Sequence, residues 1–304
     1  MPSLTDKTTD LLQRVRRLEI KTRELSRQMF SGGYHSAFKG KGMSFSEVRE
    51  YSIGDDVRSI DWNVSARTMD PHVKVFEEER EISVMLVVDV SASTVFGTQA
   101  GADGRLQLKQ EWLAEIGAVL AFSAISNQDK VGAILFTDSV EHFVPPQKGK
   151  NHVLRIIREL LEPSAASSGT DIADALRHLS NYLKKRSIVF LLSDFYQDPA
   201  TYQDALNLAR RRHDVIGIHL YDPLEARLPK VGLLRVQDPE TGSHRLIDTN
   251  EAALREEYER SFQTRLSSTK EAFRRSGADF LSLSVEDSYI QALMKFFSQR
   301  GARR

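Results

Sequence analysis

The feature that most constrains the fold is a series of short apolar runs, each followed by a helical pattern. Residues 82–88 form a nearly continuous apolar run rich in β-branched side chains, as expected of a strand buried on both faces. Similar runs lie at 131–136, 188–192, 215–220 and 279–285, and helical patterns lie at 106–126, 151–161, 171–184, 199–211, 250–275 and 287–299. This alternation predicts an α/β fold whose mostly parallel sheet has helices on both faces. The short run 140–144 is predicted to pair antiparallel at an edge.

Three further segments lie outside this rhythm. Residues 4–30 carry apolar side chains at steps of three to four residues and predict one amphipathic helix, which Ser31-Gly32-Gly33 ends. Residues 34–80 hold turn signals and one strand-like alternation, and residues 222–248 resemble a hairpin. We therefore predict an N-terminal helix in 1–33, a segment in 34–80 that forms a small β-rich subdomain with 222–248, and an α/β domain over 81–304 that carries 222–248 as an insertion.

The composition excludes several classes of site. Cysteine is absent, which excludes disulfides, thiolate zinc sites and cysteine nucleophiles and fits a reducing compartment. Lys plus Arg equals Asp plus Glu at 42 each, so bulk charge does not point to nucleic acid or an anionic membrane. The first residues lack the apolar core of a signal peptide, and the most apolar helical stretch, 112–125, is too short to span a bilayer. We expect a cytoplasmic protein without a membrane span.

Polar side chains occupy three loops at one rim of the predicted sheet. Asp89, Ser91 and Ser93 follow the first buried strand, Thr170 precedes a helix, and Asp194 follows the strand at 188–192. Ligands of open α/β sheets bind beyond the carboxyl ends of the strands, so we expect these oxygens to converge. Carboxylates and hydroxyls suit a small hard cation, which we predict to be Mg²⁺ or Mn²⁺, with Ca²⁺ as a further option. Only two carboxylates face a double positive charge, and a partner's Asp or Glu can complete the shell.

A simpler explanation for these residues is helix capping. Ser and Asp are favoured at helix N-termini and would be common in a loop between a strand and a helix. Thr170 could cap the helix that starts near Asp171, and Asp171 itself is expected to be an acid of the first helical turn. Because the residues occupy separate loops at one rim, we favour the metal site over capping.

The same residues resemble a known site. Asp89-x-Ser91-x-Ser93, Thr170 and Asp194, in this order, resemble the metal-ion-dependent adhesion site of von Willebrand factor A domains. The resemblance covers roughly residues 80–300 in layout and implies the Rossmann-type fold of these domains. It also implies a Mg²⁺ or Mn²⁺ site that engages a carboxylate of a protein partner, with Asp194 often bonding through water.

A second resemblance lies in residues 51–67. This segment resembles the signature of the bacterial "domain of unknown function fifty-eight" family, whose members join it to an A-like domain and typically accompany MoxR-type AAA+ ATPases. The resemblance implies such an ATPase as partner. The residues with a structural or partner-binding role would be Tyr51, Asp55, Asp56, Arg58, Asp61, Trp62 and Arg67. We favour a structural role for the charges, as a salt-bridge cluster that ties 34–80 to the main domain. For Trp62 we favour a core or interface anchor.

Three functions are compatible with the sequence. The first is a metal-dependent adaptor that acts with a MoxR-type ATPase in assembly or remodelling of another protein complex, without catalysis. The second is a phosphatase of the haloacid-dehalogenase type with Asp89 as nucleophile. Ser91 stands where that class has an acid, and Lys184 and Lys185 lie at the wrong end of their strand, so we do not favour it. The third is a metal-free scaffold.

Overall fold

The chain forms two compact units, one of which is the segment Phe38–Ile82. The computed structural model describes residues 19, 43–78, 82–100, 106–162, 167, 169–237 and 242–302. The predicted helix over 4–30 lies outside the described residues, apart from Glu19, which is helical. The larger unit contains the predicted α/β domain.

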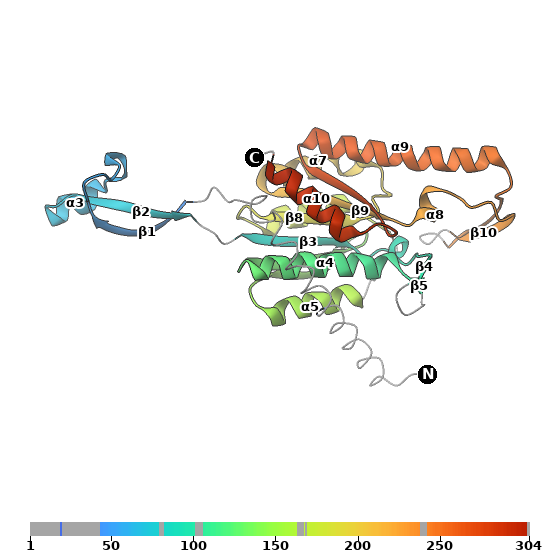
Figure 1. The fold of residues 1–304 in the computed structure, drawn as a ribbon, viewed down its shortest axis with the longest axis horizontal. Helices are drawn as coiled ribbons and strands as arrows, with labels where there is room; N and C mark the ends of the chain where they lie inside the picture. The colour runs from blue at the N-terminus through green and yellow to red at the C-terminus, as the bar shows by residue number, and fades with distance from the viewer. Residues whose placement is uncertain are drawn as a thin grey trace. The chain divides into compact units, whose positions relative to one another are not determined.

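A six-stranded sheet organises the larger unit (Figure 1). Its strands are β3 (Ser83–Asp89), β6 (Lys130–Phe136), β7 (Val140–Gln147), β8 (Ile188–Ser193), β9 (Asp214–Tyr221) and β12 (Asp279–Ser284). In space they run β12-β9-β8-β3-β6-β7, and every pair is parallel except β6 and β7. The predicted fold class is confirmed, including the antiparallel edge strand. Counted along the chain, these strands have the 3-2-1-4-5-6 order of doubly wound α/β folds.

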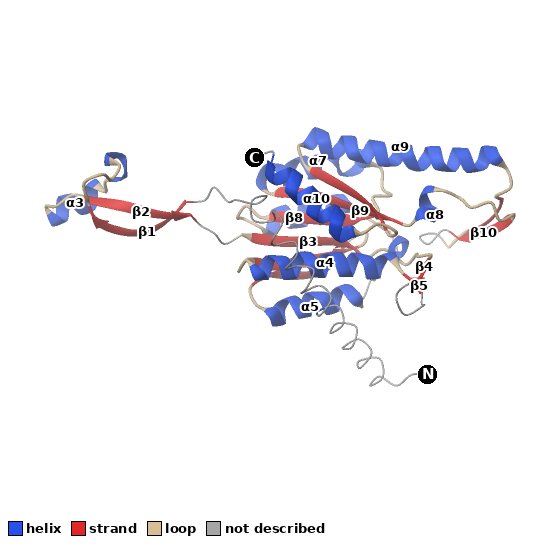
Figure 2. Ribbon diagram, viewed as in Figure 1, coloured by secondary structure: helices blue, strands red, loops and turns tan. Residues whose placement is uncertain are grey.

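Helices cover both faces of this sheet (Figure 2). They are α4 (Lys109–Ser126), α5 (Lys150–Leu161), α6 (Ile172–Tyr182), α7 (Pro199–Arg212), α9 (Ala252–Ser276) and α10 (Tyr289–Ala302). Alternation along β3 separates the two layers. Leu86 lies against Gly117 of α4, whereas Met85 and Val87 belong to a core cluster with residues of α6, α7 and α9. α10 lies on the face of α4, because its Tyr289 packs edge-on against Trp112 of α4.

The insertion at 222–248 forms the predicted hairpin. It consists of a short helix α8 (Pro223–Ala226) and the antiparallel strands β10 (Leu233–Gln237) and β11 (His244–Asp248). We expected it to share a subdomain with 34–80. The structure instead groups it with the larger unit, where α8 packs against α9 and Asp222 accepts hydrogen bonds from Thr98. The start of α4 also differs from the prediction, because residues 106–107 form β5 (Leu106–Gln107), which pairs with β4 (Gln99–Ala100).

The small unit is built on one hairpin. Its strands β1 (Met43–Glu50) and β2 (His72–Glu78) pair antiparallel, and between them lie a 3-10 turn, η1 (Val57–Ser59), and a helix, α3 (Trp62–Thr68). β2 agrees with the predicted alternation at 72–76. The sequence did not indicate α3, because seven residues give too short a window for a helical period. Among the described residues of this unit, Val73 is the buried hydrophobic residue.

No described helix is long and apolar enough to cross a membrane.

His213, at the junction of α7 and β9, makes stability depend on pH. It is fully buried, and neither ring nitrogen has a hydrogen-bond partner among the described residues. Burial, aided by Arg212 and Arg186, lowers its pKa from 6.5 to about 4. Between these values the unfolded chain binds the proton and the folded protein does not. The contribution to stability, about 3 kcal/mol, is therefore fully present above pH 6.5 and is lost as the pH falls to about 4.

Urea unfolding at pH 7 and at pH 4 measures this contribution. A His213→Gln variant should lose about 3 kcal/mol less than the wild type over this interval. His244→Gln, a change at an exposed histidine, should follow the wild-type curve. Parallel curves for wild type and His213→Gln would refute the assignment.

Candidate metal site at the end of the sheet

The candidate site lies where the sheet changes winding direction. From β3 the chain crosses to β6 on one side, and from β8 it crosses to β9 on the other. Asp89 is the last residue of β3, Ser193 is the last residue of β8, and Asp194 follows. Adjacent parallel strands thus bring their carboxyl ends together at the switch point, where ligands of this fold class bind.

Asp89 is fully buried at the centre of this edge. Its Oδ1 accepts a hydrogen bond from the Ser91 backbone N–H at 3.0 Å, and its Oδ2 accepts one from the Ser193 hydroxyl at 2.6 Å. Burial raises its pKa to about 6, and the nearby Asp194 carboxylate contributes to the rise. The ionised carboxylate is therefore costly here, and a bound cation would offset that cost.

The two serine hydroxyls contact each other. Ser91 Oγ and Ser93 Oγ lie 3.0 Å apart, and the Ser93 hydroxyl also bonds to the Asp194 carboxylate. Ser91 precedes a short 3-10 turn, η2 (Ala92–Thr94), but its side chain makes no capping hydrogen bond. Capping therefore does not account for the Ser91 hydroxyl, and the oxygens of Asp89, Ser91, Ser93 and Asp194 form one cluster.

Asp194 is held by a lysine. Its Oδ2 accepts from Lys109 Nζ at 3.0 Å, and its Oδ1 accepts from the Tyr196 N–H at 3.3 Å. Burial raises the pKa of Asp194, but the Lys109 ammonium outweighs it and holds the pKa below its usual value. The turn after Asp194 is strained, because Phe195 has a φ of 48° in the left-handed region. The Ser193 hydroxyl accepts from the Phe195 N–H at 3.0 Å and fixes this turn.

Thr170 lies in the loop before α6 and is half-buried. The next residue anchors that loop, because the Asp171 N–H donates to the Thr137 carbonyl at 2.7 Å beyond the end of β6. Thr170 does not cap α6, and Asp171 is not the first-turn acid that we expected: Asp171 is the N-cap, and its carboxylate accepts from the Asp174 N–H. In the described part of the chain, no hydrogen bond joins Thr170 to the cluster of Asp89.

Lys109, Glu225 and Ser193 belong to the site, and the sequence analysis missed them. Lys109 is only 1% exposed, and its Nζ also donates to Glu225 Oε1 at 2.6 Å. The sequence carried no visible signal for it. Lys109 is the first residue of α4, where the helix dipole disfavours a cation, but the predicted helix began at 106 and concealed this position.

The donor set fits a hard cation. The described residues contain no group of three or more His, Cys, Asp and Glu side chains that could hold a metal. The cluster instead offers two carboxylates and two hydroxyls, all oxygen donors of the kind that Mg²⁺ and Mn²⁺ accept. The buried carboxylate of Asp89, whose hydrogen bonds come from neutral groups, is the observation that most favours a cation here. A phosphatase of the haloacid-dehalogenase type is not favoured, because Ser91 stands two residues after Asp89, where that class has an acid.

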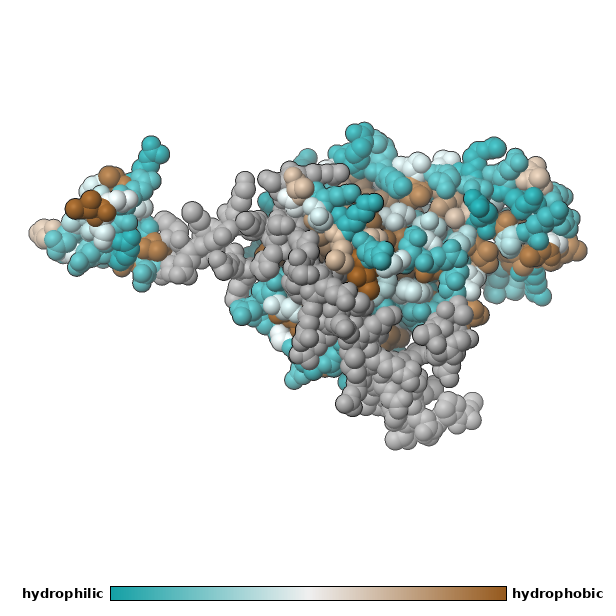
Figure 3. Space-filling view, viewed as in Figure 1, coloured by the Kyte–Doolittle hydropathy of each residue, from teal (hydrophilic) through white to brown (hydrophobic). Residues whose placement is uncertain are grey.

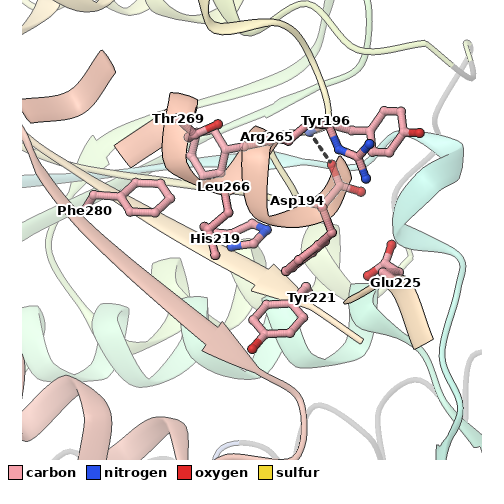
Figure 4. A pocket seen from close by; sticks show the side chains of 11 residues that line it. Asp194, Tyr196, His219, Tyr221, Glu225, Arg265, Leu266, Thr269 and Phe280 are labelled. Atoms are coloured by element: carbon pink, nitrogen blue, oxygen red, sulfur yellow. Dashed lines mark hydrogen bonds between the residues drawn. The ribbon is translucent and has the colours of Figure 1, made fainter. Parts of the chain in front are cut away.

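A small cavity lies beside Asp194 (Figure 4). Its lining includes Asp194, Tyr196, His219, Tyr221, Glu225 and Arg265. The His219 ring stacks on Tyr221 at 5.3 Å, and the Arg265 guanidinium lies 4.5 Å above the Tyr196 ring. The volume of about 20 Å³ is enough for roughly one water molecule.

The signature carboxylates organise the small unit from within. Asp55 makes two hydrogen bonds to Arg49, at 2.8 and 2.7 Å. Asp56 accepts from the Arg58 N–H and caps η1, and Asp61 caps α3 and lies 3.4 Å from Lys74 Nζ. Each of these bonds is internal to the unit and agrees with a structural role there.

Other signature residues are exposed on that unit. The Trp62 side chain is 70% exposed, so it is not a core residue. Ile53, Val57 and Met69 are also exposed, and Figure 3 shows hydrophobic atoms on the surface of the unit. The exposed residues Arg58 and Arg67 accompany them, whereas Tyr51 is half-buried and donates its N–H to the Pro71 carbonyl. We call Ile53, Val57, Trp62 and Met69 the exposed apolar residues of the small unit.

Comparison with known proteins gives one family and several similar chains. Residues 47–267 match the family model described as "Protein of unknown function DUF58". The uncharacterized protein Rv1480 of Mycobacterium tuberculosis is 29% identical over 288 residues, which cover 94% of this chain and 88% of that protein.

Among solved structures, an aerotolerance-related membrane protein from Bacteroides fragilis is 15% identical, with a TM-score of 0.49, over 73% of this chain and 100% of that chain. A von Willebrand factor type A protein from Catenulispora acidiphila is 13% identical, with a TM-score of 0.33, over 66% of this chain and 44% of that chain.

Proposed function

The chain belongs to the DUF58 family of proteins of unknown function, and from this premise we propose that it is a metal-dependent module that binds a protein partner. The observation that carries the proposal is the oxygen cluster at the switch point. It places a fully buried Asp89 beside the hydroxyls of Ser91 and Ser93 and the carboxylate of Asp194. Its donor set is that of a hard cation with few protein carboxylates.

The roles of the residues follow from their contacts. Asp89, Ser91 and Ser93 would hold Mg²⁺ or Mn²⁺, with Ca²⁺ as a third option, and Asp194 would contribute from the neighbouring loop. For Thr170, support comes from the resemblance to the metal-ion-dependent adhesion site and not from a contact with the cluster. When bound, the ion supplies a coordination position for a carboxylate of the partner. Ser193 keeps Asp89 in place through Oδ2, and the burial of Asp89 excludes water from its far side. Nothing in these roles needs a nucleophile, and we propose binding without catalysis.

For the partner we propose a MoxR-type AAA+ ATPase, with which the module would act in the assembly or remodelling of another protein complex. Support comes from the resemblance of residues 51–67 to the family signature. The exposed apolar residues of the small unit would provide further contacts, with Trp62 as their anchor. Exposed Trp with neighbouring Arg is the composition of binding hot spots, and Arg58 and Arg67 flank Trp62 in the sequence.

Co-purification of the tagged full-length chain from its own cells tests the proposal. An AAA+ ATPase should be retained with Mg²⁺ present and lost with a chelator. Trp62→Ala should weaken retention at equal Mg²⁺, because loss of a hot-spot Trp costs about 2 kcal/mol or more of binding free energy. The exposed Tyr182→Ala, outside the signature, is the matched control and should retain the ATPase. The proposal would be refuted if the ATPase were retained equally with and without the chelator and equally by the wild type and Trp62→Ala.

A further inference from the structure

A buried ammonium lies against the candidate metal site. Lys109 is 1% exposed, and its Nζ lies 3.0 Å from Asp194 Oδ2 and 2.6 Å from Glu225 Oε1. Burying an ammonium costs several kcal/mol unless carboxylates compensate it, and the positive end of the α4 dipole adds to that cost. The position is therefore maintained by Asp194 and Glu225, and Asp194 also belongs to the oxygen cluster.

The start of α8 holds the Glu225 carboxylate in position to pair with Lys109. Glu225 Oε2 accepts from the Asp222 N–H at 2.8 Å, which leaves Oε1 for Lys109. Asp222 in turn accepts from the Thr98 N–H at 2.8 Å and from the Thr98 hydroxyl. Thr98 lies in the chain that continues from Ser91 and Ser93. The lysine, α8 and the loop of the two serines are thus joined by consecutive hydrogen bonds.

Lys109 and a divalent ion compete for the carboxylate of Asp194. Lys109 already compensates Asp194, and its single positive charge repels a divalent ion that approaches the same carboxylate. Asp89 has no such cation, since its two oxygens accept from a backbone N–H and a serine hydroxyl. A divalent ion therefore gains fully from Asp89 but must share Asp194 with Lys109.

We propose that Lys109 is an internal counter-ion that competes with the divalent ion for Asp194 and keeps the affinity for metal low in the free protein. The inference rests on the proposed function. Lys109 neutralises part of the negative charge that Asp194 would otherwise offer to the ion. A partner's carboxylate replaces that charge, so the ion and the partner bind cooperatively. By linkage, each raises the affinity for the other by the same factor.

Mn²⁺ titration of the full chain, followed by electron paramagnetic resonance of free Mn²⁺, tests the inference without a partner or an activity. Lys109→Met should bind Mn²⁺ on the order of 10-fold more tightly than the wild type. Glu225→Gln should bind it more weakly, because Lys109 then pairs with Asp194 alone. The double variant Lys109→Met, Glu225→Gln keeps the net charge and should still bind more tightly than the wild type.

Lys295→Met, which removes an exposed lysine of α10, is the matched control and should leave the affinity unchanged. Glu225→Gln keeps the lysine paired, so this arm decides the question if Lys109→Met does not fold. Two results would overturn the inference and leave the proposed function intact, provided that the wild type binds Mn²⁺. In the first, neither Lys109→Met nor the double variant binds Mn²⁺ more tightly than the wild type. In the second, Glu225→Gln does not bind it more weakly. Absence of Mn²⁺ binding in every variant would overturn both.

Discussion

An Asp89→Asn variant will bind Mn²⁺ at least about 100-fold more weakly than the wild type, because the loss of a ligand should exceed the 10–100-fold effect of losing a ligand's supporting partner. Asn keeps the shape of Asp and can still accept from the Ser91 N–H, so the turn after β3 is retained. The fold should survive. Burial raises the pKa of Asp89, which means that the ionised carboxylate is unfavourable in the metal-free protein, and the neutral amide removes that cost.

Calorimetric titration with Mn²⁺ measures the loss, and a thermal melt without metal confirms that the variant is folded. Asp204→Asn removes an exposed carboxylate of α7 and should bind Mn²⁺ like the wild type. An Asp89→Asn protein that is folded and binds Mn²⁺ with wild-type affinity would exclude Asp89 as a ligand.

An Arg300→Met variant will lose about 3–5 kcal/mol of unfolding free energy, the cost of breaking a buried ion pair. Arg300 of α10 is 6% exposed, and its guanidinium lies 2.5 Å from Asp214 Oδ2 and 2.9 Å from Asp279 Oδ2. Asp214 and Asp279 are the first residues of β9 and β12. They therefore lie at the amino-terminal ends of the strands, whereas the candidate metal site lies at the carboxyl ends. Without Arg300, Asp214 is left as a buried carboxylate that has lost its cation.

Chemical denaturation of wild type and variant gives this difference. Arg227→Met breaks a surface pair with Glu259 at 3.0 Å and should cost less than about 1 kcal/mol. Mn²⁺ affinity should be equal in both variants, because neither residue lies at the oxygen cluster. A loss for Arg300→Met as small as that for Arg227→Met would show that the buried pair does not stabilise the fold.

The fold was accessible from the sequence where hydrophobic patterns are long. Residues 82–88 read as a doubly buried strand because both faces of β3 are covered by helices, and no polar alternation interrupts the run. The small unit offered no such pattern. α3 spans two turns, and β1 alternates around a register shift between Phe45 and Glu47, which breaks the two-residue period.

The candidate site was accessible only in part, for a topological reason. Asp89 and Asp194 could be predicted as neighbours, because residues that follow adjacent parallel strands must meet at one edge. Lys109 and Glu225 could not, because they approach this edge from a helix start and from the insertion. The Lys109 Nζ contacts Asp194 and Glu225, which lie 85 and 116 positions further along the chain, and hydrophobic periodicity does not encode such contacts.

Anomalous diffraction from crystals of the wild-type chain grown with Mn²⁺ tests the central claim most directly. We predict one manganese peak at the carboxyl ends of β3 and β8, within bonding distance of oxygens of Asp89, Ser91 and Ser93. The account would be contradicted if crystals grown in saturating Mn²⁺ showed no manganese peak near Asp89, whether or not manganese is bound elsewhere.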